Sequence, residues 1–148
     1  MHTRSAGLTL LELLVALALF GALAAIALPD LRRTLAAWRL NAAARQVVMD
    51  LKLTRAQAIA AGVTQRLRFT AAAGRYQRER QSGGSYVAVG PPTALPDGVI
   101  VADCSAAGSG ISFRPRGLAA TFGTITLRDV DGVERRIVVD IAGRLRLA

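Results

Sequence analysis

The residues of this chain that could do chemistry are mostly arginines. Of its 148 residues 19 are basic and 10 are acidic, so the formal net charge is +9, and every basic residue except Lys52 is an arginine. Guanidinium groups bind phosphate and carboxylate oxygens through paired hydrogen bonds. The excess of arginine favours a polyanionic partner such as nucleic acid or anionic lipid headgroups, and it carries no information about the fold.

The sequence offers few residues for catalysis or metal binding. His2 is the only histidine and Cys104 the only cysteine, so no nucleophile has an evident histidine base and the spacing of a zinc site is absent. No nucleotide-binding glycine loop occurs. We expect no enzymatic activity, no cofactor and no bound metal. The single cysteine excludes an intramolecular disulfide and leaves Cys104 either as an inert, partly buried thiol or as a group that reacts between molecules.

The most specific basic motif is Gly143-Arg144-Leu145-Arg146 near the end of the chain. In a strand, alternation would place Arg144 and Arg146 on one side and both neighbouring leucines on the other. If this segment were not held in a sheet, the two arginines would form a mobile tail, and either arrangement suits phosphate oxygens. The alternative is that each arginine belongs to a solvated strand face. Four further arginines would widen the basic patch if the fold brought them near: Arg114, Arg116, Arg135 and Arg136.

The N-terminal part of the chain predicts a membrane-spanning helix. Residues 8–28 form an apolar run of 21 residues with Glu12 as the only charge. As a helix this run is about 31 Å long, and the hydrocarbon core of a bilayer is about 30 Å thick. The run follows a short basic segment, residues 1–7, that ends in Gly7. A small residue before the apolar run, rather than after it, differs from a conventional secretory signal.

Glu12 is the one residue in this run whose insertion into a membrane is unfavourable. A charged side chain inside the bilayer costs about 2.5–3.5 kcal/mol on insertion scales, so a carboxylate there needs a partner. The positive end of the helix dipole favours an anion in the first turn. Glu12 either serves in assembly with another subunit or extends to the membrane interface.

Helical periodicity continues beyond the apolar run. Pro29 is expected to kink the helix, because it removes a backbone hydrogen bond. Between residues 29 and 61 apolar residues recur on one stripe and no strong breaker appears before Gly62. We therefore predict one helix from about residue 8 to residue 61, whose segment 29–61 is amphipathic and lies on a soluble domain.

Residues 62–148 change to the alternating pattern of strands. Asp131-Gly132 and Ala142-Gly143 provide turn chemistry for hairpins. The predicted fold is α+β, with a long N-terminal helix, transmembrane in its first half, packed on a small antiparallel β-sandwich. The expected strands are 65–70, 75–80, 86–89, 99–102, 111–113, 124–128, 135–141 and 144–147.

The N-terminal pattern resembles that of type IV pilins. The resemblance rests on Gly7, the following Leu8-Thr9-Leu10-Leu11-Glu12 and the unbroken apolar run. It implies a leader, residues 1–7, that a prepilin peptidase removes after Gly7. It also implies that Leu8, where the family usually has phenylalanine, becomes an N-methylated terminus, and that Glu12 pairs with the amino terminus of a neighbouring pilin subunit. The proline at position 29 agrees with the same family.

The resemblance also implies a location. The precursor would cross the bacterial inner membrane once, with its N-terminus in the cytoplasm and its C-terminal domain in the periplasm, before it enters a pilus or pseudopilus. The C-terminal half resembles the FimT/GspH family of minor pilins and pseudopilins through Phe113-x-Pro115-x-Gly117, Gly123-Thr124-Ile125-Thr126-Leu127 and the Gly143–Arg146 motif.

These motifs are compatible with two functions. In the FimT branch a C-terminal Gly-Arg-x-Arg motif is associated with DNA capture, so one expectation is a minor type IV pilin that binds double-stranded DNA for uptake in natural transformation. Residues from Gly62 onward carry twelve basic and seven acidic side chains, which favours this expectation. The alternative is a structural, GspH-like minor pseudopilin of a type II secretion system that contacts only other proteins.

Overall fold

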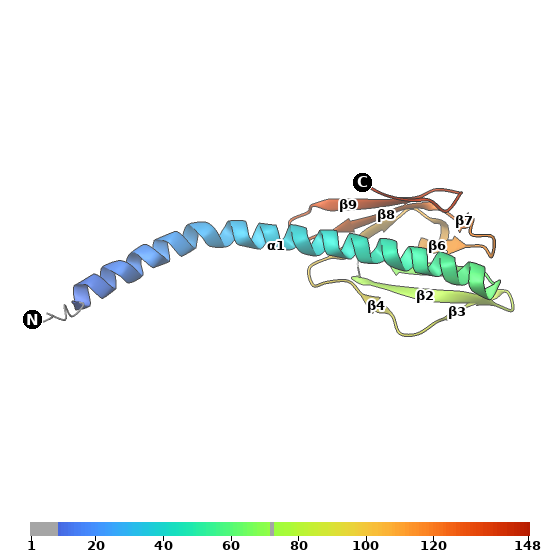
Figure 1. Cartoon of the computed structure of the whole chain (residues 1–148), viewed down its shortest axis with the longest axis horizontal. Coiled ribbons are helices and arrows are strands. Elements are labelled where there is room, and N and C mark those ends of the chain that lie inside the picture. The colour runs from blue at the N-terminus through green and yellow to red at the C-terminus, as the bar shows by residue number, and fades with distance from the viewer. Residues whose placement is uncertain (1–8, 72) are drawn as a thin grey trace, which may run out of the picture. The chain divides into compact units, whose positions relative to one another are not determined.

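The computed structural model describes residues 9–71 and 73–148 (Figure 1). One long helix, α1 (Leu10–Ala61), is followed by short strands and one 3₁₀ turn, η1 (Ala107–Ser109). The α+β class with a long N-terminal helix on antiparallel sheets is confirmed. The strands are β1 (Gln65–Thr70), β2 (Arg75–Ser82), β3 (Ser85–Ala88), β4 (Thr93–Ala94), β5 (Ile100–Cys104), β6 (Gly110–Phe113), β7 (Ala119–Thr121), β8 (Gly123–Arg128), β9 (Glu134–Val139) and β10 (Leu145–Leu147).

Both ends of α1 have local causes. Thr9 caps the N-terminus, because its Oγ1 accepts a hydrogen bond from the backbone N–H of Glu12 at 3.2 Å. At the other end Gly62 adopts φ = +65°, a left-handed conformation that terminates helices. The helical assignment continues through residue 29, so Pro29 does not interrupt the helix. The kink expected at Pro29 stays a prediction.

The chain divides into two compact units, one up to Leu35 and one from Ala36 to Ala148. The second unit includes the C-terminal half of α1 because that half supplies part of its core. Leu40, Val47 and Leu51 are 0–1% exposed. Every buried residue in the described part of the chain belongs to this second unit.

The strands of the second unit form two antiparallel sheets. The first has the order β3-β2-β1-β6-β7, with β4 also paired to β2, and the second has the order β10-β9-β8-β5. In the second sheet Ile125 of β8 lies opposite Ile137 of β9, and Leu145 of β10 lies opposite Val139 of β9. The register therefore places alternate apolar residues of three strands on one face.

The core lies between α1 and the inner faces of both sheets. Leu67, Phe69 and Phe113 come from the first sheet, and Leu127 and Ile137 from the second, each at most 2% exposed. Figure 1 shows the second half of α1 passing over the strands, with β9 on one side of the helix and β2 on the other. The helix thus joins two sheets that share no strand.

Most predicted strands are present with small shifts at their ends. Residues 65–70 form β1 as expected, and the predicted strand 144–147 is shorter, because β10 begins at Leu145. The strands β4 and β7 were not expected from the sequence. These strands have two and three residues, too few for an alternating pattern to be recognised.

Candidate functional sites

The first turn of α1 carries the residue predicted for assembly. Glu12 is exposed, and its backbone N–H is capped by Thr9 three residues earlier. A Thr-x-x-Glu sequence at a helix start is the capping-box pattern, which places the carboxylate near the positive end of the dipole. The pattern could have identified Thr9 as the cap from the sequence alone.

The apolar segment that follows is almost entirely uncovered in the single chain. Leu10, Leu17, Phe20 and Ile26 are 70–79% exposed. The helix contains an 18-residue window of mean hydropathy 2.5, long and apolar enough to cross a membrane. An exposed apolar surface of this length needs a lipid or protein environment. The predicted cleavage residues Gly7 and Leu8 lie outside the described residues.

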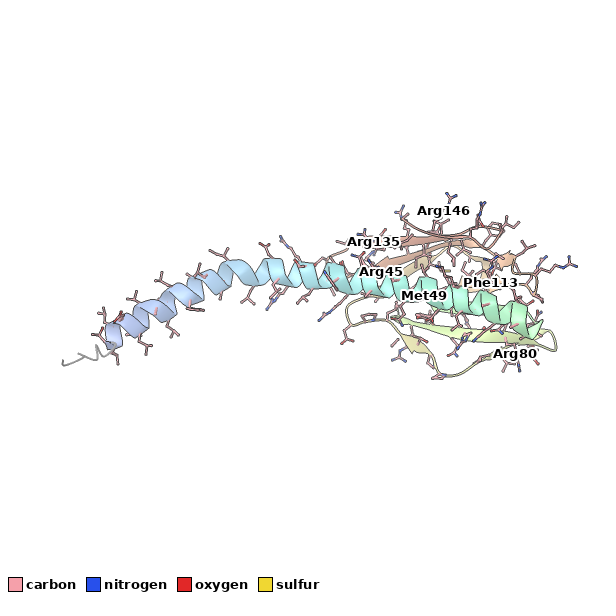
Figure 2. The ribbon with its side chains drawn as sticks, viewed as in Figure 1. Arg45, Met49, Arg80, Phe113, Arg135 and Arg146 are labelled. Carbon is pink, nitrogen blue, oxygen red and sulfur yellow. The ribbon has the colours of Figure 1, made fainter. Side chains whose placement is uncertain are left out.

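The second candidate site is the outer face of the β8-β9-β10 sheet. Arg146 lies opposite Val138, and a shallow hollow of about 170 Å³ is lined by Val138, Asp140, Arg144 and Arg146. The fold therefore brings Arg144 and Arg146 onto one face. The leucines between and after them point the other way, and Figure 2 shows Arg146 directed away from α1.

Two carboxylates partly neutralise this outer face. Nε of Arg144 donates to Oδ2 of Asp140 at 2.8 Å, and Asp140 also accepts the backbone N–H of Arg144. Glu134 pairs with Arg128 at 2.7 Å and with Arg136 at 3.5 Å. The hydrogen bond from Arg128 holds the pKa of Glu134 below its usual range, and the backbone bond from Arg144 is the main cause that lowers the pKa of Asp140.

The structure separates Arg135 from the rest of the predicted patch. Its Nε donates to Oδ1 of Asn41 on α1 at 3.0 Å, so Arg135 faces the helix, whereas Arg136 faces outward. Neighbouring residues on a strand point to opposite faces, and only the position of the helix decides which is which. The fold therefore does not bring Arg135 to the outer face, whereas Arg136 lies on it.

The loop between β6 and β7 brings two further arginines toward the same end. Arg114 and Arg116 are exposed in this loop, and the carbonyl of Gly117 accepts a hydrogen bond from Nε of Arg55 on α1 at 2.8 Å. A Cβ built on Gly143 would lie 2.7 Å from the same carbonyl oxygen. The loop is thus packed against the β9–β10 turn, next to Arg144. No local pattern in the sequence indicates this role of Arg55, which is 62 residues away from Gly117.

Metal binding has no site in the described part of the chain. Within residues 9–71 and 73–148 no three histidine, cysteine or acidic side chains are grouped closely enough to hold a metal ion. Cys104 is a free thiol, half-buried on β5. Burial is the largest cause that raises its pKa, which disfavours the reactive thiolate.

The helix α1 begins with a cap and an acid in its first turn, and its apolar first half is uncovered. It continues into a unit of two antiparallel sheets. This is the architecture of a type IV pilin-like subunit. Two family comparisons agree. The family described as type II transport protein GspH matches residues 43–143, and the prokaryotic N-terminal methylation motif matches residues 2–28. The chain belongs to the GspH family of minor pilins and pseudopilins.

Solved structures of similar fold come from both kinds of filament. The minor pseudopilin EpsH from the type II secretion system of Vibrio cholerae is 16% identical, with a TM-score of 0.60 over 74% of this chain and 96% of that chain. The type IV minor pilin FimU of Pseudomonas aeruginosa is 15% identical, with a TM-score of 0.56 over 74% of this chain and 87% of that chain. At these identities the likeness establishes the fold. A comparison with curated protein sequences found no match.

Proposed function

We propose that this protein is a structural minor subunit of a type II secretion pseudopilus, held in the inner membrane as a precursor and then packed into the filament through α1. The observation that carries the proposal is the uncovered apolar segment of α1 with Glu12 in its capped first turn. In a filament, neighbouring helices would cover this segment as lipid does in the membrane. The match of residues 43–143 to the family described as type II transport protein GspH supports the choice of filament.

In this proposal a prepilin peptidase cuts between Gly7 and Leu8 on the cytoplasmic side, and the soluble unit lies in the periplasm. The amino group of Leu8, after methylation, comes from one subunit, and the Glu12 carboxylate that neutralises it comes from another. A charge pair in an apolar environment is far stronger than in water, and leaving either charge alone is costly. The pair would therefore set the register of helices in the filament.

The test replaces Glu12 by glutamine in the full chain, expressed in the source bacterium. The variant should be cleaved and retained in the membrane, because a neutral amide is easier to insert than a carboxylate. It should fall by at least about tenfold in the sheared filament fraction, as expected for the loss of a charge pair worth more than about 1.4 kcal/mol.

The matched control is Asp30→Asn, which removes an exposed acid from the same helix. Mass spectrometry of the wild-type N-terminus checks cleavage and methylation at Leu8. Normal entry of Glu12→Gln into filaments would overturn the assembly role of Glu12. Loss of the gene should reduce protein secretion; loss of twitching or DNA uptake instead would indicate a type IV pilus.

A second candidate is a minor pilin that binds double-stranded DNA. The observation in its favour is that the Gly117–Gly143 contact brings Arg114 and Arg116 to the same end as Arg144, with Arg146 following on β10. Guanidinium groups spaced in this way would contact phosphates with little preference for base sequence. The ion pair of Arg144 with Asp140 reduces the available charge, which is why this candidate stands second.

Anisotropy titration of a labelled duplex with the full chain in detergent tests this candidate. Binding should weaken steeply with salt, with each neutralised phosphate adding about 0.9 to the log–log slope. Changing Arg144 and Arg146 together to glutamine should lower affinity for all duplexes alike, and Arg75→Gln with Arg80→Gln is a control of equal charge on the other sheet. Absence of binding at low salt would eliminate the DNA candidate and leave the structural one.

A further inference from the structure

We propose that the groove between α1 and the free edge of β10 binds an extended, acidic segment of a partner protein, which adds a strand to the β10-β9-β8-β5 sheet. This α1–β10 groove has a volume of about 410 Å³ and is lined by Arg45, Val48, Met49, Lys52, Leu145 and Leu147. Its volume lies within the range of ligand-binding pockets, about 300–1,000 Å³. In Figure 2, Arg45 and Met49 lie on α1, and Arg135 lies on the neighbouring strand β9.

The free edge of β10 is the first observation. β10 is the terminal strand of its sheet. Arg136 and Ala148 exchange backbone hydrogen bonds of 3.0 and 2.8 Å, and Asp140 donates its backbone N–H to Arg144. In an antiparallel pair the bonded positions alternate, so the N–H and C=O groups of Leu145 and Leu147 face away from β9. These four groups form a template for one more strand.

The floor of the groove is apolar and open. Met49 is 64% exposed and Leu147 is 48% exposed, while Val48 and Leu145 pack against the core. A strand added beside β10 would cover Leu147 and Met49 with its own side chains. An apolar floor of this kind suits a polypeptide, because apolar side chains can cover it. A nucleic-acid backbone would leave the floor uncovered, and its phosphates would lose their water in the groove.

The charge of the groove determines which kind of partner segment can bind. Arg45 and Lys52 stand on the helical side of the groove, and the described residues place no carboxylate within ion-pair distance of either. They are seven residues apart, or about 10.5 Å along a helix, and side chains four apart in a strand are about 13 Å apart. Two acidic residues four apart, with an apolar residue between them, would meet both cations and the apolar floor.

A neighbouring hollow continues the groove toward the start of the unit. It has a volume of about 280 Å³ and is lined by Trp38, Asn41, Ala42 and Arg45, so Arg45 borders both. Trp38 is 75% exposed, and such aromatic residues are common anchors at protein interfaces. The partner segment can thus extend beyond β10 along the helix.

The experiment titrates the full chain in detergent with an acetylated and amidated peptide, TETVTET, whose two glutamates are four residues apart. Amide hydrogen exchange at Leu145 and Leu147 should slow by at least about fivefold, because each new backbone hydrogen bond is worth up to about a tenfold change in an equilibrium. The amide of Arg146, already bonded to β9, should change little. The peptide TKTVTKT, with lysines in place of the glutamates, should not bind.

Two variants test the two contacts separately. Leu147→Pro removes an N–H that faces the free edge and leaves the bonds to β9 in place, so it should lower affinity about tenfold. Arg45→Glu with Lys52→Glu should abolish binding without touching the sheet. The charge control is Arg80→Glu, an exposed residue of β2 that Figure 2 shows on the other side of the helix, and it should bind normally.

Several outcomes would overturn the proposal. Equal binding of TETVTET and TKTVTKT would remove the charge argument, and binding without slower exchange at Leu145 and Leu147 would remove the added strand. If self-association of the chain or duplex DNA protects these two amides and the peptide does not, the partner is a second copy of the chain or a nucleic acid, and not an acidic segment. Unchanged binding by the Arg45→Glu, Lys52→Glu variant, checked to be folded by circular dichroism, would also contradict it.

Discussion

Arg144 and Asp140 face each other across the β9–β10 turn, with Nε of the arginine 2.8 Å from Oδ2 of the aspartate. Asp140 also accepts the backbone N–H of Arg144, so one carboxylate both closes the turn and neutralises the first arginine of the terminal motif. Arg146 has its side chain on the same face. The charge that this face presents therefore depends on Asp140 as much as on the arginines.

Replacing Asp140 by asparagine should strengthen DNA binding if the second candidate function is right. The amide can still accept the backbone N–H, while Arg144 loses its counter-charge, so one more phosphate contact should add about 0.9 to the salt slope. Anisotropy titrations at several salt concentrations measure the slope. Asp97→Asn changes the net charge equally from an exposed loop and should have a smaller effect.

The pH dependence of that pair has a definite sign. The pKa of Asp140 is lowered in the folded chain, chiefly by the backbone bond from Arg144, so the pair is present at neutral pH and is lost as the pH falls through that lowered pKa. Wild type and Asp140→Asn should therefore converge in DNA affinity only at strongly acidic pH. Convergence near neutral pH would contradict the pairing.

Gly143→Ala should destabilise the 36–148 unit by about 1–3 kcal/mol. Gly143 has φ = +74°, and an added Cβ would lie 2.7 Å from the carbonyl oxygen of Gly117. Gly132→Ala is the matched control, because Gly132 has φ = +82° with open space around it. Urea unfolding of both variants measures the difference. Equal losses would mean that backbone strain alone, and not the contact with Gly117, limits residue 143.

Tyr76→Phe should lower stability at neutral pH and should remove part of the stability loss that the wild type shows at alkaline pH. Tyr76 is 1% exposed and its hydroxyl donates to Asp50; burial is the largest cause that raises its pKa well above the usual range. A raised pKa in the folded state means that stability is full below about pH 10, the ordinary tyrosine pKa, and is lost as the pH rises above it. The wild-type unit should therefore lose stability above pH 10.

The phenylalanine variant separates the titration of Tyr76 from that of other groups that titrate at alkaline pH. It should lose about 1–3 kcal/mol at neutral pH, because the Asp50 carboxylate loses a buried donor, and it should lack the tyrosine part of the alkaline loss. Unfolding midpoints from pH 7 to 11 measure both effects. An alkaline loss of equal size in both proteins would assign the transition to other groups.

Cys104 should react slowly with iodoacetamide at neutral pH. The thiol is half-buried and burial raises its pKa, so little thiolate is present. The alkylation rate of the folded chain should fall well below that of the urea-unfolded chain and should rise with pH. Mass spectrometry over time measures the rate. Equal rates in both states would indicate an accessible, reactive thiol and support the intermolecular role.

Local patterns in the sequence were sufficient to predict the apolar first half of α1 and most of the strands. The apolar run from residue 8, the acid at Glu12 and the breaker at Gly62 are short-range signals, because helix length, capping and termination depend on neighbours within a few residues. Alternation likewise found β1 and β8 almost to the residue. The family of the chain follows from the same N-terminal signals together with its C-terminal motifs.

The faces of the sheets were decided only by the tertiary structure. Alternation predicts that Arg135 and Arg136 point to opposite sides, but the packing of α1 determines that Arg135 meets Asn41 while Arg136 faces outward. The contact of Arg55 with Gly117 spans 62 residues, and the free edge of β10 depends on the order of all four strands. Such relationships arise from long-range pairing and burial, which no local periodicity encodes.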